Sequence, residues 1–323
     1  MKAKIIRGAS AAAVKRGIIQ SRGLGDILIA LPIARHYFDR GEEIVWPICE
    51  EFYGSVKDSV DWVTWVPMKT DDRGAFFLEQ PLKIFKYHGV DPNAALYLYH
   101  YLNTLPELTD PELFNILKFD QYKYWRSGVP FRNKWTLSSC IARDPAREDS
   151  LRSSVGIVPG ERYYVTSLRG SDFNAPIPLN WLDPAVKVVD VDQHITDSIF
   201  DWISILEGAE AIVCVDSAVA NMVDQLCIQG PELYWLRRSP WDLTPVLGSQ
   251  WTIVPTNLPI KDPVRVDPAA EAQKKRAQLQ PQPVIQPKSA AQANGGEQSS
   301  LTSHVPFKAA GAIPTSFMHA LKK

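Results

Sequence analysis

The chain has 323 residues, of which 45% are hydrophobic and 22% charged, the balance of a globular protein large enough for two domains. A formal net charge of −1 excludes a wholly basic nucleic-acid-binding protein, and no apolar run reaches the ~18 residues that a membrane span requires. The four cysteines are scattered and form no CxxC pair, which favours reduced thiols and a cytoplasmic location.

The two ends of the chain differ in composition from its middle. Residues 1–17 form a basic arm, and residues 268–323 carry seven basic side chains against two acidic ones, with no Trp, Tyr or Asp. The C-terminal tail has too little apolar surface to offset the entropy of ordering it, so we expect it to be disordered. A passive tail is the favoured interpretation. The alternative is a weak contact of the arm and the tail with a polyanion.

Residues 18–150 alternate between short apolar strands and amphipathic helices, which predicts a parallel sheet covered by helices. Strands are expected at residues 18–20, 43–48 and 62–66, and helices at residues 27–37, 83–105 and 111–125. These elements make up the first predicted domain.

A second series of strands and helices follows the charged stretch 143–154, which is expected to be a loop. Strands are expected at residues 163–168, 186–191, 211–215, 233–236 and 251–254, and helices at residues 197–207 and 216–226. Residues 151–267 therefore form a second parallel α/β domain. A cleft between the two domains is the natural place for a ligand, because ligands bind beyond the carboxyl ends of parallel strands.

The first predicted strand-to-helix turn contains Gly23, Gly25 and Asp26. Glycines permit a sharp turn and a close ligand, and an aspartate at a helix N-terminus stays ionised and can act as a general base. The alternative is that Asp26 only caps the helix. The turn lacks the third glycine of GxGxxG, so it does not indicate a dinucleotide site.

The second informative turn follows the apolar strand at residues 211–215. Asp216 and Ser217 precede small residues at the helix entry, where exposed N–H groups can bind a phosphate; Asp216 could accept hydrogen bonds from sugar hydroxyls or simply cap the helix. Another strand end adds hydroxyls and a cation to the same cleft. These residues are Thr166, Ser167 and Arg169.

Residues 23–32 resemble the N-terminal signature of glycosyltransferase family 9, the ADP-heptose lipopolysaccharide heptosyltransferase-like family, and residues 209–221 resemble its donor-binding motif. The resemblance spans about residues 18–254. It implies a GT-B-like α/β fold, with two Rossmann-like parallel-sheet domains facing a cleft. It also implies inverting, metal-independent sugar transfer from a nucleotide sugar, with no cofactor beyond that donor.

Carried over residue by residue, the resemblance makes Asp26 the catalytic base and assigns donor contacts to Asp216 and Ser217. The chain departs from the family at Ala218, where glycine is usual, and at Asn221, where histidine is usual. Arg169 is the nearest candidate for the basic residue that the family places after the strand at residues 163–168. The second domain is short for the family, so the identity of the donor sugar stays open.

Other patterns are weaker. Asp190 and Asp192 form a DxD at a strand end, which metal-dependent sugar transferases use, but we interpret it as incidental in a GT-B-like domain. Aromatic residues that could stack on sugars or bases gather in the first domain, although most should be core. They are Trp62, Trp65, Tyr87, Tyr97, Tyr99, Tyr101, Tyr122, Tyr124, Trp125 and Trp135.

Three functions remain open at the level of sequence. The leading one is a glycosyltransferase that moves a sugar from a nucleotide-sugar donor to a hydroxyl acceptor, the acceptor being a glycan. The second keeps this chemistry but takes hydroxymethylated DNA bases as acceptor, as virus-encoded transferases do; the basic arm and tail favour it and the acidic core opposes it. The third is a non-catalytic nucleotide-sugar-binding or scaffolding protein.

Overall fold

The computed structural model describes residues 14–71, 74–99, 116–169, 183–191, 195–236 and 245–254, together with Leu113. All of these residues belong to the first of two units into which the chain divides, Met1–Leu258. The predicted basic arm up to residue 13, the predicted tail, His100, Tyr101, Asp192 and His194 lie outside the described residues.

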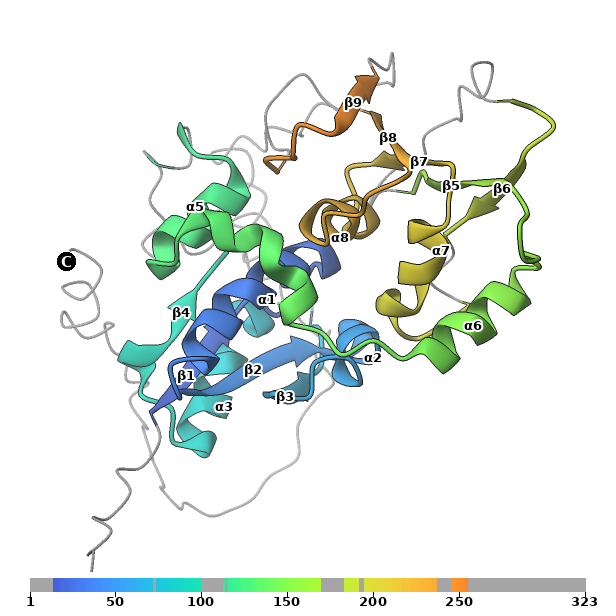
Figure 1. Ribbon diagram of the computed structural model, residues 1–323. Coiled ribbons are helices and arrows are strands. Elements are labelled where there is room, and N and C mark those ends of the chain that lie inside the picture. The colour runs from blue at the N-terminus through green and yellow to red at the C-terminus, as the bar shows by residue number, and fades with distance from the viewer. Residues whose placement is uncertain are drawn as a thin grey trace, which may run out of the picture. The chain divides into compact units, whose positions relative to one another are not determined.

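The first α/β region contains a four-stranded parallel sheet in the order β3-β2-β1-β4 (Figure 1). Its strands are β1 (Lys15–Ile19), β2 (Glu43–Cys49), β3 (Val63–Met68) and β4 (Leu96–Tyr97). Its helices are α1 (Leu24–Phe38), α2 (Glu50–Lys57), α3 (Glu79–His88) and α5 (Phe119–Ser127), with 3-10 turns η1 (Ala75–Phe77), η2 (Pro92–Ala94) and η4 (Phe131–Ser139). Strand β1 begins at Lys15, which pairs with Glu43, so the sheet takes in the end of the predicted arm.

The second region contains a five-stranded parallel sheet in the order β6-β5-β7-β8-β9. Its strands are β5 (Tyr163–Ser167), β6 (Lys187–Asp190), β7 (Ala211–Val215), β8 (Glu232–Leu236) and β9 (Trp251–Val254). Its helical segments are α6 (Pro145–Ser154), η6 (Ile199–Trp202), α7 (Ile203–Glu207) and α8 (Ala218–Gln225). The prediction of two parallel-sheet α/β regions is confirmed.

Two predictions of local structure are wrong. The helix expected over residues 83–105 ends at His88, because Gly89 adopts the left-handed conformation (φ 68°) that closes α3; Leu96 and Tyr97 instead pair with β1 as strand β4. The stretch expected to be a loop at residues 143–154 is mostly helix α6. Its N-cap, Asp144, accepts hydrogen bonds from the N–H groups of Ala146 and Arg147.

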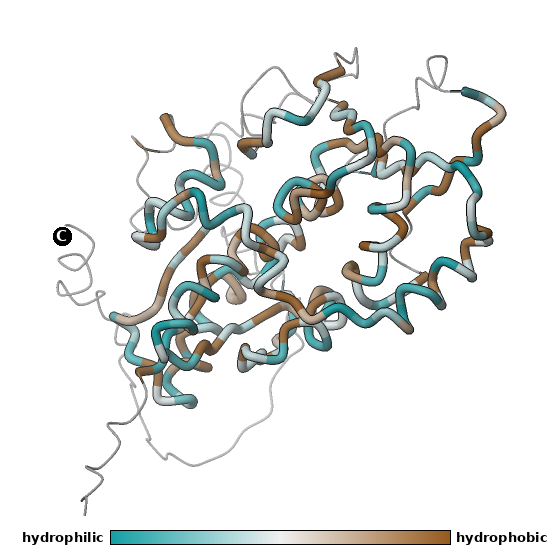
Figure 2. The backbone as a smooth tube through the Cα atoms, viewed as in Figure 1, coloured by the Kyte–Doolittle hydropathy of each residue, from teal (hydrophilic) through white to brown (hydrophobic). Residues whose placement is uncertain are grey.

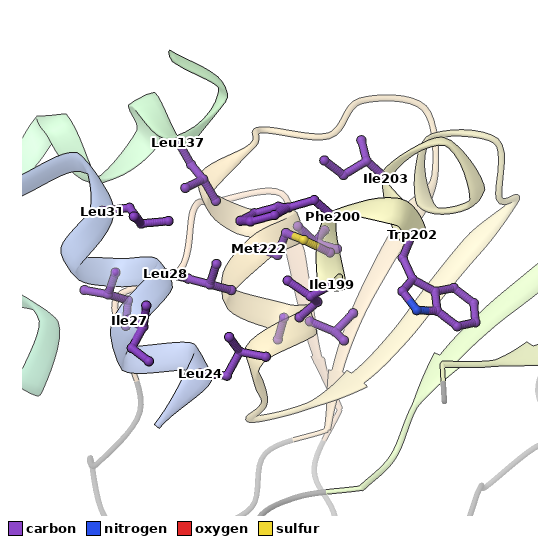
Figure 3. Close-up of a cluster of buried hydrophobic side chains, with 14 of the residues drawn as sticks. Leu24, Ile27, Leu28, Leu31, Leu137, Ile199, Phe200, Trp202, Ile203 and Met222 are labelled. Carbon is purple, nitrogen blue, oxygen red and sulfur yellow. The ribbon is translucent and has the colours of Figure 1, made fainter. Parts of the chain in front are cut away.

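Helix α1 joins the two regions through its apolar face. Its side chains belong to the same buried cluster as Phe200 and Met222 from the second region, and Figure 3 shows Leu28 and Leu31 directed toward them. Figure 2 shows the contrast with α6, which is largely hydrophilic along its length. The contact between α1 and α8 is therefore filled by packed side chains.

Candidate functional site

The turn between β1 and α1 requires glycine at position 23 for two reasons. Gly23 has φ 84°, a conformation that other residues rarely adopt. A Cβ at this position would also lie 2.7 Å from Oδ2 of Asp26. The hydroxyl of Tyr99 accepts hydrogen bonds from the backbone N–H groups of Ser21 (2.9 Å) and Arg22 (3.1 Å). The turn is thus held from outside while the Asp26 carboxylate folds back over Gly23.

Asp26 lies in the first turn of α1, and the N-cap of that helix is Gly23. Its side chain is 39% exposed, and Oδ1 forms an ion pair with Nζ of Lys123 at 3.0 Å. Lys123 is only 1% exposed and also donates to Oε1 of Gln20 (2.7 Å) and to the carbonyl of Leu98 (2.8 Å). The position of Asp26 differs from that of a capping residue, and its main partner comes from α5.

The N-terminus of α8 is capped by Ser217, whose Oγ accepts a hydrogen bond from the N–H of Ala220 at 3.3 Å. Asp216, which the sequence offered as a possible cap, lies half-buried between β7 and this cap. The Oγ of Ser167 lies 3.4 Å from the Oγ of Ser217, which joins the ends of β5 and β7. Asn221 is buried and donates from Nδ2 to the carbonyl of Ser217 at 3.0 Å.

The two sequence motifs meet where α1 crosses α8. A Cβ on Gly25 would lie 3.2 Å from Nδ2 of Asn221 and 3.5 Å from Cα of Ala218. The N-terminal turns of both helices therefore converge, with Asp26 adjacent to Gly25. Helix N-termini carry partial positive charge and outward N–H groups, so this convergence favours an anion such as phosphate.

Thr166 and Arg169 belong to a neighbouring cluster at the end of β5. Thr166 is fully buried and donates from Oγ1 to Oδ1 of Asp190 at 3.0 Å, while the half-exposed Arg169 lies 3.5 Å from the other oxygen of Asp190. Asp190, part of the DxD interpreted above as incidental, thus accepts hydrogen bonds from two residues that were predicted to bind the nucleotide-sugar donor. The structure joins Ser167 to Ser217, and it joins Thr166 and Arg169 to Asp190.

Sequence reasoning missed Lys123, Gln20 and Tyr99 as parts of the site. Lys123 stands between Tyr122 and Tyr124 with no motif around it, so only the tertiary structure reveals its role. The sequence indicates Tyr99 only as one of many aromatics, whereas in the structure its hydroxyl holds the turn between β1 and α1. Burial raises the pKa of this hydroxyl far above its ordinary value, so Tyr99 is neutral at physiological pH.

Several of the described histidines and aromatic residues lie away from the site. His36 lies in the last turn of α1, and burial, together with the charge of Arg40, lowers its pKa. Tyr122 and Tyr124 are buried, whereas Tyr87 and Trp125 are exposed on helices.

Within the described ranges, no helix combines the length and the apolar character needed to cross a membrane.

Comparison with known proteins gives likenesses in structure alone. No protein-family model matches the sequence, and no curated protein matches it. A family 9 glycosyl transferase from Veillonella parvula DSM 2008 aligns with a TM-score of 0.48 at 11% identity, covering 83% of this chain and 90% of that one.

Two further solved structures are enzymes of E. coli. ADP-heptose lps heptosyltransferase II aligns with a TM-score of 0.44 at 10% identity over 82% of this chain and 98% of that one. Heptosyltransferase WaaC aligns with a TM-score of 0.39 at 14% identity over 81% and 100%. These neighbours are glycosyltransferases, and the case for what this chain does rests on its own residues.

Proposed function

We propose that this chain is a GT-B-type glycosyltransferase that moves a sugar from a nucleotide-sugar donor to a hydroxyl acceptor. One observation carries the proposal: the contact of Gly25 with Ala218 and Asn221, which puts a half-exposed carboxylate beside two helix N-termini. Sugar transfer needs this pairing, because a base must deprotonate the acceptor while an anion-binding site stabilises the leaving diphosphate.

In the proposed reaction, the acceptor hydroxyl attacks the anomeric carbon of the donor sugar. A new C–O bond forms, the bond between that carbon and the diphosphate oxygen breaks, and the leaving diphosphate takes the electron pair. The hydroxyl proton passes to Asp26. Direct attack from the face opposite the leaving group inverts the anomeric centre, and the N–H groups at the start of α8 take the part that a metal ion plays in metal-dependent transferases.

The donor is assigned to the second region. Ser217, Ser167 and the first N–H groups of α8 bind its diphosphate, and Asp216 accepts hydrogen bonds from the sugar. Asn221 occupies the place of the family's usual histidine, so this chain offers a neutral amide where its relatives offer an ionisable ring. A glycan hydroxyl is the proposed acceptor, bound on the side of α1.

A calorimetric titration against UDP-, GDP-, ADP- and CMP-sugars tests the proposal first. One of them should bind, and Asp216→Ala should weaken that binding by 10-fold or more. Asp144→Ala is the matched control: it removes an aspartate from the N-cap of α6, which costs about 1 kcal/mol of stability but leaves donor affinity unchanged.

Turnover is tested with the donor that binds and with a panel of glycan acceptors, by release of the nucleoside diphosphate. Release that depends on Asp26 supports the transferase. Donor binding without release over the whole panel would leave a nucleotide-sugar-binding protein, and failure of every donor to bind would overturn the proposal.

A further inference from the structure

Lys123 is a buried ammonium whose surroundings are almost fully accounted for. Its Nζ lies 3.0 Å from Oδ1 of Asp26, 2.7 Å from Oε1 of Gln20 and 2.8 Å from the carbonyl oxygen of Leu98. An ammonium has three protons to donate, and these three acceptors match them. The side chain is 1% exposed, so the ammonium is shielded from bulk water.

Burying a charged lysine is costly unless it is paired and hydrogen-bonded. Two of its three acceptors are neutral, so the charge of Lys123 is balanced by Asp26 alone among its direct partners. Gln20 extends the arrangement, because its Nε2 donates to the carbonyl of Arg22 at 2.8 Å. Lys123 is therefore linked to both ends of the turn that carries Asp26.

We infer that Lys123 is a positioning residue, which holds Oδ1 of Asp26 and leaves Oδ2 as the atom that takes the proton from the acceptor hydroxyl. The inference rests on the proposed function and extends it to one atom of the base. The ammonium of Lys123 is already paired with Oδ1 in the protein without substrate. Oδ2 lies over Gly23. A Cβ at that position would be only 2.7 Å from Oδ2, so glycine leaves space beside this oxygen.

Charged and titratable groups approach the turn that carries Asp26 from several described elements. The turn itself contains Arg22, which pairs with Glu51 of α2 at 3.7 Å, and Cys49 of β2 lies near Tyr99. Helix α5 contributes Lys123, and the segment after β4 contributes Tyr99, which burial keeps neutral. From α8, the residues nearest to the start of α1 are Ala218 and Asn221, neither of which titrates. Lys123→Met would therefore leave the Asp26 carboxylate without the ion pair that the described residues give it.

A double-mutant cycle with Lys123→Met and Asp26→Asn tests the inference. Lys123→Met alone should lower kcat about 10–100-fold, the effect of one hydrogen bond to a charged group, with donor affinity unchanged. In the Asp26→Asn background, the same change should have little further effect on kcat, because Lys123 acts through that carboxylate. Equal factors in both backgrounds would overturn the inference.

Lys134→Met is the matched control, since Lys134 is also buried in an ion pair but contacts neither Asp26 nor the turn that carries it. It should lower stability while leaving kcat of the folded protein unchanged. Lys123→Arg retains the cation and should recover part of the lost rate. If Lys134→Met lowers kcat as Lys123→Met does, the effect is structural and the inference fails.

Urea unfolding of the four proteins of the cycle (the wild type, Lys123→Met, Asp26→Asn and the double variant) gives a readout that does not need turnover. Coupling between Lys123 and Asp26 should appear as non-additive shifts of the unfolding midpoint. Coupling in stability without coupling in kcat would reduce Lys123 to a structural residue. If the wild type transfers no sugar, the proposed function fails on its own, and the stability cycle still decides whether Lys123 holds the carboxylate.

Discussion

Lys123 and Lys134 are both buried in ion pairs, but the two clusters are enclosed differently. Lys134 lies 2.9 Å from Oδ2 of Asp120 and 3.3 Å from Oδ2 of Asp224, and all three side chains are completely buried. Lys123 is equally buried, whereas its partner Asp26 is 39% exposed. One cluster is closed on every side, and the other opens through its carboxylate.

The oxygens of the closed cluster are saturated by the protein itself. Asp224 accepts from the backbone N–H of Gly248 at 2.7 Å and from the indole N–H groups of Trp135 and Trp251, each at 3.1 Å. These contacts tie α8 to η4, to β9 and to the segment before β9. A carboxylate with no remaining acceptor site can only stabilise the fold, whereas Asp26 keeps one oxygen for an outside partner.

The same substitution in both clusters should therefore differ in its effect on turnover. Asp26→Asn keeps an oxygen for Lys123 but removes basicity, so we expect the turnover rate to fall about 10²–10⁴-fold. The unfolding free energy should fall as well, by about 2–3 kcal/mol, because the buried ammonium of Lys123 loses its balancing charge and keeps only neutral acceptors. Steady-state kinetics and urea unfolding measure the two effects; a near wild-type rate would place the base elsewhere.

Asp224→Asn should lower stability without lowering turnover. An amide NH₂ at either oxygen position would face Lys134 and Trp135 or Gly248 and Trp251, all of which donate. We expect a loss of about 3–5 kcal/mol in unfolding free energy, typical of breaking a buried ion pair, while kcat of the folded fraction stays unchanged. A loss below about 1 kcal/mol would show that this cluster does not stabilise the fold.

Gln20→Met tests the link between the buried ammonium and the turn. Methionine fills similar space but removes the acceptor for Lys123 and the donor for Arg22. Because Asp26 still balances the ammonium, the rate should fall only about 2–10-fold, equivalent to one ordinary hydrogen bond. Single-turnover kinetics at saturating donor measure this step. A fall as large as that of Lys123→Met would make Gln20 the main support of the turn.

Much of the fold was predictable because its signals are local. The apolar runs of β5 and β7 and the spacing of apolar residues in α1 are readable within one element. Helix α6 was missed because its charges suggested a loop. In the structure they are paired with η6, α7 and the preceding segment, as in the contact of Arg147 with Asp201.

The candidate site was predictable only in part. Asp26 and Ser217 are candidates from the sequence because each follows a strand at the start of a helix, which is visible in the sequence. The sequence could not show which residues cap the two helices. In the structure Gly23 is the N-cap of α1, and Ser217 rather than Asp216 caps α8. Lys123 could not be found, because nothing local distinguishes a lysine that will be buried beside a distant carboxylate.

An exposed ion pair should show the smallest effect of all. Arg147 pairs with Asp197, whose side chain is 61% exposed, and the hydrogen bond from Arg147 holds the pKa of Asp197 below its usual value. A lowered pKa in the folded state means that the pair stabilises the fold above the pKa of the unfolded aspartate, near 3.9. That contribution is lost as the pH falls through the folded pKa.

Asp197→Asn should therefore cost about 0.5 kcal/mol at pH 7. Urea unfolding from pH 7 downward should show this difference shrinking in acid and in high salt, because solvent screens the pair. A difference that persists at low pH would mean that Asp197 stabilises the protein by packing or hydrogen bonding rather than by its charge.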